Sequence, residues 1–92
     1  MPFRASTDPK FRRRLDKKSP KQRAAVLECM RKLLDDPRQD TGLRSKKLRT
    51  SGEDVWYSRA SRSERVTWAY GAEQNTIVFL NHCDHDEVLR NP

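Results

Sequence analysis

Hydrophobic and polar residues alternate along the second half of the chain in a pattern that predicts three consecutive strands. Residues 55–60 and 65–70 alternate with a period of two, which is typical of half-buried strands. Two polar stretches, residues 61–64 and 71–75, separate the strands as turns. The run 77–80 is apolar on both faces, so we expect it to lie between other strands, with one of its faces covered by helices.

The first half of the chain carries two helix start signals. Residues 3–6 are short but suit a first strand, and Thr7 or Asp8 then caps a helix with a proline in its first turn. Ser19 and the proline after it repeat the signal for a second helix, which runs to about Asp36. Two helices joined so closely should form an antiparallel hairpin on one face of the sheet.

The apolar residues of the two predicted helices form one narrow stripe each. Phe11 and Leu15, four residues apart, share a face of the first helix. The stripe of the second helix consists of Val26, Met30, Leu33 and Leu34. We expect Cys29 at the flank of that helix, as a small inert residue. With residues 46–49 as a further short strand, residues 1–92 are predicted to be a single α+β domain, in which the helical hairpin packs on one face of a four- to five-stranded, mainly antiparallel sheet.

Charge is abundant and unevenly distributed. The net charge of +7, the pI of about 9.9 and the 36% of charged residues indicate a thin core and an anionic partner, either nucleic acid or an acidic protein. Residues 1–50 hold 16 Lys and Arg against 6 Asp and Glu, whereas residues 51–92 hold 4 against 7. Two cysteines without metal-ligand spacing predict a reduced, cytoplasmic setting, and no apolar run suggests a membrane partner.

Strand alternation sorts the side chains of the predicted sheet onto two faces. If Trp56 and Trp68 face the helices, the residues of opposite parity face away from them on an uncovered surface, namely Tyr57, Arg59, Arg65 and Thr67. The guanidinium groups on that surface suit phosphate oxygens, and the tyrosine ring suits base stacking. The alternative is that Arg59 and Arg65 are solvated charges or partners of acidic residues near the C-terminus.

Two histidines follow the last predicted strand. His82 and His85 can move protons near neutral pH, and with two guanidiniums nearby they supply what RNA cleavage without a metal requires. The sequence leaves open which of them acts, and His82 by itself is better explained as a structural residue. A metal site among these histidines and the neighbouring acidic residues is disfavoured, because nothing else in the chain completes a ligand set.

The ordered set of segments 55–60, 64–70, 77–80 and 85–89 resembles the RelE/ParE superfamily of bacterial toxins. The resemblance implies a toxin of a type II toxin–antitoxin pair, with two N-terminal helices on a largely antiparallel sheet. Members similar to RelE, YoeB and YafQ enter the A site of the ribosomal 30S subunit and cut mRNA there without a metal or other cofactor. Their cognate antitoxin masks the active face, and the toxin reaches operator DNA only through that antitoxin.

The resemblance also implies roles for individual residues. Arg65 matches an arginine of RelE and YoeB that stabilises the phosphate during the reaction. His85 matches the C-terminal catalytic histidine of YoeB and YafQ, and Arg59 matches a basic position on the strand that carries catalytic lysine in RelE. Lys46 stands where YoeB has a glutamate base, so that role is not inherited. Further contacts to RNA or its phosphates are expected from Lys46, Lys47, Arg49, Tyr57 and Arg62.

One departure and two alternatives accompany this hypothesis. Leu89 stands where many relatives have an aromatic residue that helps to hold the substrate, and Tyr57 is the candidate replacement. A ParE-like toxin that poisons DNA gyrase needs no nuclease residues. A non-catalytic member would only bind an antitoxin and regulate transcription.

Overall fold

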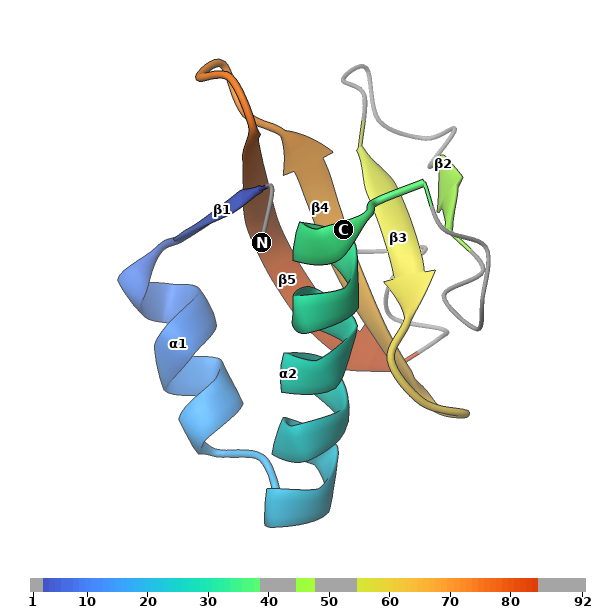
Figure 1. The fold of residues 1–92 in the computed structure, drawn as a ribbon. Coiled ribbons are helices and arrows are strands. Elements are labelled where there is room, and N and C mark those ends of the chain that lie inside the picture. The colour runs from blue at the N-terminus through green and yellow to red at the C-terminus, as the bar shows by residue number, and fades with distance from the viewer. Residues whose placement is uncertain (1–2, 39–44, 48–54, 85–92) are drawn as a thin grey trace.

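The computed structural model describes residues 3–38, 45–47 and 55–84, which form two helices and five strands. In chain order the elements are β1 (Arg4–Thr7), α1 (Pro9–Asp16), α2 (Pro20–Asp35), β2 (Lys46–Lys47), β3 (Trp56–Arg59), β4 (Glu64–Tyr70) and β5 (Thr76–Asp84). The strands form one sheet of order β1-β5-β4-β3-β2, in which β1 is parallel to β5 and the other neighbours are antiparallel (Figure 1). The predicted α+β fold is confirmed, and β5 lies between two other strands as its apolar sequence requires.

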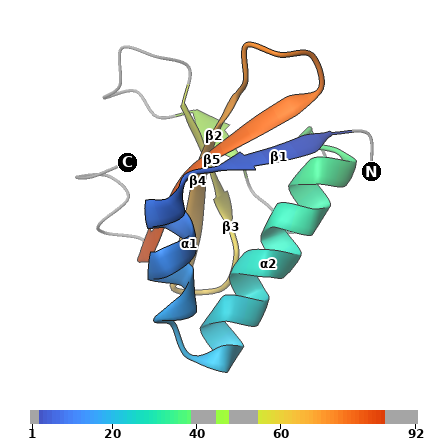
Figure 2. The same ribbon diagram turned by 90° about the vertical axis from the view of Figure 1, so that its left-hand side faces the viewer.

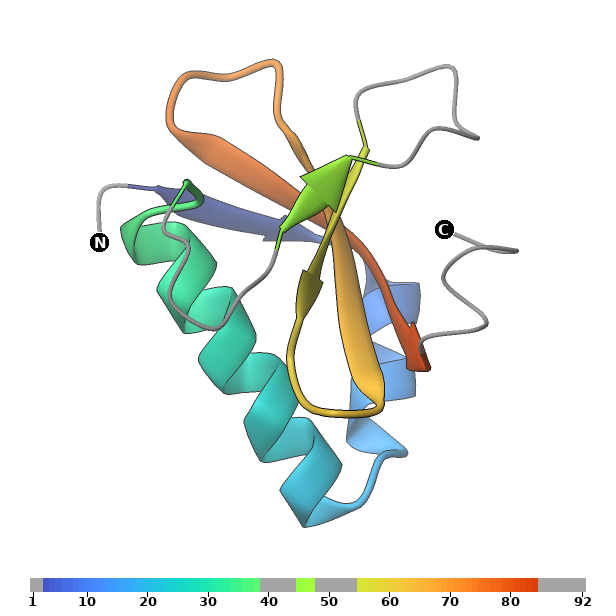
Figure 3. The same ribbon diagram turned by 90° about the vertical axis from the view of Figure 1, so that its right-hand side faces the viewer.

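Both helices lie on the same side of the sheet. Figures 1 and 2 show α1 beside β5 and α2 beside β4, with the short connection between the helices at the end away from β1. The opposite side of the sheet carries no helix that the structure describes. Figure 3 shows the sheet from the edge formed by β2, with α2 on one side of it. Neither described helix has the length and apolar character needed to cross a membrane.

The two helices begin where the sequence predicts. The Asp8 carboxylate accepts a hydrogen bond of 2.7 Å from the backbone N–H of Phe11, which caps α1. Ser19 caps α2 in a capping box with Gln22, in which each side chain binds the backbone N–H of the other residue. A proline occupies the first turn of each helix, where its missing N–H costs nothing.

The core lies between the helices and the sheet. It contains Phe11, Leu15, Val26, Cys29 and Leu33 from the helices, and Val66, Trp68, Ile77 and Phe79 from the strands. The expectation for Cys29 was wrong, because its side chain is only 2% exposed and packs centrally. Val26, Cys29 and Leu33 point at the sheet, which leaves Met30 and Leu34 at the margin of the core.

Register confirms the predicted parity of β3 and β4. Trp56 lies opposite Trp68 on the helix side, where the two rings stack with centroids 5.9 Å apart. Ser58 is fully buried on the same side, and its hydroxyl accepts a 2.8 Å hydrogen bond from the indole N–H of Trp68. Arg59 and Arg65 therefore have the opposite parity and face away from the helices.

A β-bulge interrupts the pairing of β4 with β5. Trp68 pairs with Phe79 but Thr67 pairs with Asn81, so Leu80 has no partner on β4. The Asn81 side chain compensates for the break, because its Oδ1 accepts hydrogen bonds from the His82 backbone N–H at 2.9 Å and from Arg14 Nη1 at 2.7 Å. The extra residue reverses the alternation of β5, so both Phe79 and His82 point into the core.

Candidate active site

Arg59 and Arg65 are register partners at the end of the β3–β4 hairpin, on the sheet face turned away from the helices. Both side chains are half-buried. Like charges directly opposite on neighbouring strands destabilise a sheet. Arg59 also forms no hydrogen bond or ion pair with any residue that the structure describes. This arrangement concentrates positive charge at one place and suits the binding of an anion.

The guanidinium of Arg65 is held against the turn that precedes it. Its Nη1 donates to the carbonyl oxygens of Ser61 at 2.8 Å and Glu64 at 3.0 Å. The turn is itself fixed, since the Glu64 backbone N–H donates to the Ser61 hydroxyl and the Ala60 N–H donates to the Glu64 carbonyl. These carbonyl groups position the guanidinium of Arg65 at the turn.

A second row of side chains lies next to the arginine pair. Lys46 is the register partner of Tyr57, and Tyr57 is the partner of Thr67, so all three share the face of the arginines. Lys46 is exposed and Tyr57 is half-buried. The structure therefore brings together Lys46, Tyr57, Arg59 and Arg65.

The remaining residues with predicted RNA contacts are placed differently. Lys47 pairs with Trp56 and so has the parity of the helix side of the sheet. Arg62 lies in the exposed β3–β4 turn, where its carbonyl is 3.4 Å from Arg65 Nη1. Arg49 and His85 lie outside the described residues, so their roles stay predictions.

The expectation of an uncovered face needs correction. Thr67, in the middle of the second row, is 0% exposed, and Val55, just before β3, is 5% exposed. Neither belongs to the core beneath the helices. Alternation predicts the direction of a side chain correctly, but it does not predict what packs over that side chain.

His82 belongs to the core and not to the arginine face. Its ring packs edge-on against Phe11 with centroids 4.6 Å apart, and its Nε2 lies 3.1 Å from the Phe11 carbonyl oxygen. That contact makes Nε2–H the donor, because a carbonyl can only accept. Burial lowers the pKa of His82 below its usual value and keeps the ring neutral. His82 is therefore a structural residue on the opposite side of the sheet from Arg65.

Beneath the arginine pair lies an ion pair that sequence reasoning missed. Glu64 precedes Arg65 on β4 and points to the helix side, where Lys18 Nζ lies 3.0 Å from each of its carboxylate oxygens. The two residues are 46 positions apart in the sequence. Strand parity predicts the direction of Glu64, but no signal in the sequence identifies its partner.

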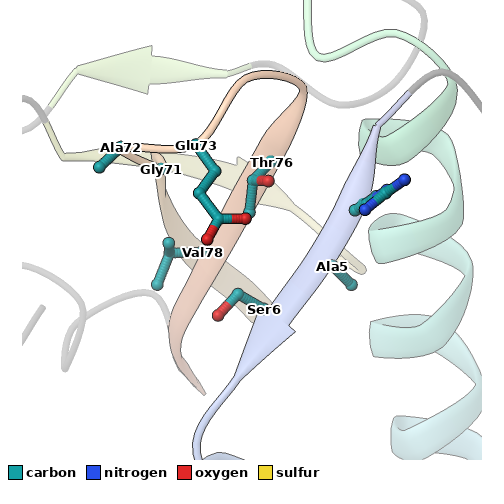
Figure 4. A pocket seen from close by; sticks show the side chains of 8 residues that line it. Ala5, Ser6, Gly71, Ala72, Glu73, Thr76 and Val78 are labelled. Carbon is teal, nitrogen blue, oxygen red and sulfur yellow. The ribbon is translucent and has the colours of Figure 1, made fainter.

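A shallow pocket of about 390 Å³ occupies the far corner of the same sheet face. It lies between β1, the start of β5 and the β4–β5 turn, where Figure 4 shows Ser6, Thr76, Val78 and Glu73 around it. None of the residues predicted to act on RNA lines it. Over the described part of the chain, no three His, Cys, Asp or Glu side chains are grouped to hold a metal ion.

The fold is shared with several solved toxin structures. A RelE–RelB complex of the archaeon Pyrococcus horikoshii superposes with a TM-score of 0.74 at 19% identity, covering 91% of this chain and 96% of that one. The Mycobacterium tuberculosis toxin–antitoxin complex RelBE2 superposes with a TM-score of 0.72 at 25% identity, covering 92% of this chain and 100% of that one. A YoeB/ParE toxin from Agrobacterium tumefaciens superposes with a TM-score of 0.71 at 10% identity, covering 90% of this chain and 99% of that one.

Sequence comparison adds no closer relative. No protein-family model matches the chain, and no curated protein sequence matches it. Each of these structural matches nevertheless covers at least 90% of the chain. The chain therefore has the fold of the RelE, YoeB and ParE-like toxins of toxin–antitoxin systems.

Proposed function

We propose that this chain is the toxin of a type II toxin–antitoxin pair and cleaves mRNA in the ribosomal A site. The observation that carries the proposal is the cross-strand pair of Arg59 and Arg65, two like charges opposite each other on a sheet face without helices. Such a pair costs stability in the free protein, and an RNA phosphate bound between the guanidiniums offsets that cost. Lys46 and Tyr57 extend the face in the direction of a neighbouring nucleotide.

The proposed reaction is attack of a ribose 2′-hydroxyl on the adjacent phosphate. The 2′-oxygen forms a bond to phosphorus, the bond to the departing 5′-oxygen breaks, and a 2′,3′-cyclic phosphate results. Arg65 stabilises the negative charge of the crowded phosphorane, because turn carbonyls already hold its guanidinium in place. The 2′-hydroxyl loses its proton to water as the new bond forms, and His85 donates a proton to the departing 5′-oxygen. Arg59 and Lys46 position the scissile backbone.

The partner that controls this activity is proposed to be a cognate antitoxin. The P. horikoshii and M. tuberculosis neighbours were each solved as complexes of this kind. An acidic antitoxin segment on the arginine face would pair with the guanidinium groups there and would exclude mRNA. Contact with operator DNA is then made by the complex, through the antitoxin.

The test is cleavage in a purified translation system. Ribosomes stalled on a defined message are mixed with the protein, and primer extension maps the cuts. We expect cuts within the A-site codon, and we expect Arg65→Ala to lower kcat about 10²- to 10³-fold. Arg4→Ala is the matched control, since Arg4 is an exposed arginine at the opposite corner of the sheet.

Other outcomes identify the alternatives. Trapped DNA breaks in the presence of gyrase, with the message intact, would support a gyrase poison. Tight binding of the antitoxin without damage to either target would support a non-catalytic regulator. Full activity of Arg65→Ala at equal protein concentration would remove Arg65 from the mechanism.

A further inference from the structure

Helix α1 carries a row of cations on the side opposite its core contacts. Lys10, Arg13 and Lys17 follow one another at spacings of three and four residues, which places them on one stripe. Phe11 and Leu15, the buried residues of this helix, occupy the other side. All three side chains of this basic stripe are exposed.

The basic stripe repels itself. Like charges three or four residues apart destabilise a helix by about 0.2–0.5 kcal/mol per pair. Asp16, the carboxylate within α1, forms no ion pair with any residue that the structure describes. On α2 the same spacing of three and four residues joins opposite charges, because Arg31 forms ion pairs with both Glu28 and Asp35. The free protein thus tolerates repulsion on α1 that it avoids on α2.

The basic stripe is separate from the arginine face. Helix α1 packs against β5 on the helix side of the sheet (Figure 1). Arg59 and Arg65 point away from that side. One phosphate cannot contact both surfaces. A ligand that uses both must be large enough to reach around the sheet.

We propose that Lys10, Arg13 and Lys17 form a second phosphate-binding surface, which holds structured ribosomal RNA while the arginine face holds the message. The inference rests on the proposed function. Phosphate contacts need only correctly spaced cations and are independent of base sequence. A protein partner needs an apolar centre in its interface. Among the described residues, the exposed large hydrophobic side chains are Leu27, Tyr70 and Leu80, and none of them belongs to α1. Leu80 is the one beside the stripe, because it lines a cavity of about 180 Å³ together with Lys10.

Two variants with equal loss of charge test the proposal. The stripe variant is Lys10→Gln, Arg13→Gln, Lys17→Gln, and the control is Arg4→Gln, Lys21→Gln, Arg38→Gln, which removes three exposed cations outside α1. Binding of each to a fluorescent A-form RNA hairpin and to 70S ribosomes is measured over a salt series. The stripe variant is expected to lose about tenfold or more in affinity, and its salt slope to fall by roughly 2 to 3.

Thermal unfolding separates the loss of a surface from the loss of the fold. Because the stripe variant removes like-charge repulsion, its Tm should equal or exceed that of the unaltered protein. Weaker binding together with a lower Tm would overturn the proposal. Equal weakening in both variants would also overturn it, since net charge alone would then explain the affinity. Greater loss of binding to polyglutamate than to RNA would assign the stripe to an acidic protein and overturn it too.

The outcome can be distinguished from failure of the proposed function. In the cleavage assay the stripe variant should raise the KM for ribosomes and leave kcat unchanged, because it touches no reacting atom. An unchanged KM with normal cleavage would overturn the second surface and leave the nuclease intact. If the unaltered protein did not cleave at all, the hairpin measurement would still decide whether the basic stripe binds RNA.

Discussion

Lys18 and Glu64 form an ion pair that joins the connection between the helices to the first residue of β4. The Lys18 Nζ lies 3.0 Å from both carboxylate oxygens, and the two side chains are 16% and 6% exposed. The pair fixes the end of the β3–β4 hairpin on the helix side, directly behind the residue that carries the proposed catalytic guanidinium. It therefore links the stability of the helical layer to the geometry of the arginine face.

Lys18→Met should destabilise the protein by about 3 kcal/mol, because it leaves a carboxylate buried without a cation. Urea unfolding followed by circular dichroism measures the change in the free energy of unfolding. Lys18→Arg keeps the charge and should cost much less. The double variant Lys18→Met, Glu64→Leu removes both charges and should recover part of the loss. If the double variant were as unstable as the sum of the two single changes, the pair would not be coupled.

Ser58→Ala should cost about 1–3 kcal/mol, because the buried indole N–H of Trp68 loses the hydroxyl that accepts its hydrogen bond. The change removes one oxygen and leaves a cavity smaller than a water molecule. Ser63→Ala, at an exposed position in the β3–β4 turn, is the control and should be neutral. Urea unfolding monitored by tryptophan fluorescence tests both, and equal midpoints would show that the bond contributes nothing to stability.

His82 should make the protein lose stability in mild acid. Burial lowers the pKa of His82 below the 6.5 of a free imidazole, and the cations of Lys18 and Arg14 lower it further. The hydrogen bond to the Phe11 carbonyl and the charge of Glu64 raise the pKa, but they do not outweigh the effect of burial. The unfolded chain therefore binds this proton more readily than the native one. The contribution to stability is complete above about pH 6.5 and is lost as the pH falls from there towards the lower native pKa.

The measurement is the urea midpoint at a series of pH values between about 5 and 8. His82→Gln should flatten the acid limb of this profile, because the group that takes up the proton on unfolding is gone. His85→Gln removes the other histidine of the chain and serves as the control. If the acid limb survived in His82→Gln and disappeared in His85→Gln, His85 and not His82 would be the residue whose protonation destabilises the protein.

Cys29 should not react with a thiol reagent while the protein is folded. Burial raises the pKa of this thiol to about 12, so almost no thiolate forms near neutral pH. In a Cys83→Ser background, modification of Cys29 by a disulfide reagent should require unfolding and should speed up with added urea. Rapid modification without denaturant would mean that α2 opens readily from the sheet.

Most of the fold was predictable because its signals are local. Capping residues and prolines determine where the helices begin, and alternation gives β3 and β4 their correct faces. The phase of α2 was not predictable to the same degree, and so the position of Cys29 was predicted wrongly. Which of several apolar residues faces the sheet depends on how the helix packs as a whole. The Lys18–Glu64 pair is a tertiary contact that no local pattern encodes.

The candidate site shows the same division. Alternation along the strands predicts Tyr57, Arg59 and Arg65 on one face, and register adds Lys46 to them. Lys47 is separated from that group, since successive residues of a strand point to opposite faces. Burial of Thr67 was not predictable, because it depends on what lies over the sheet.

The unpaired Leu80 divides β5 into two halves with independent phase. The half before it meets α1 and α2 through Ile77 and Phe79, while the half after it pairs Cys83 with Arg65. Deleting that single residue would remove the bulge without moving either half, because Phe79, Asn81 and His82 would then alternate regularly opposite Trp68, Thr67 and Val66. A chain with this fold can therefore gain or lose one residue at this point and still keep the same residues of β5 beside its arginines.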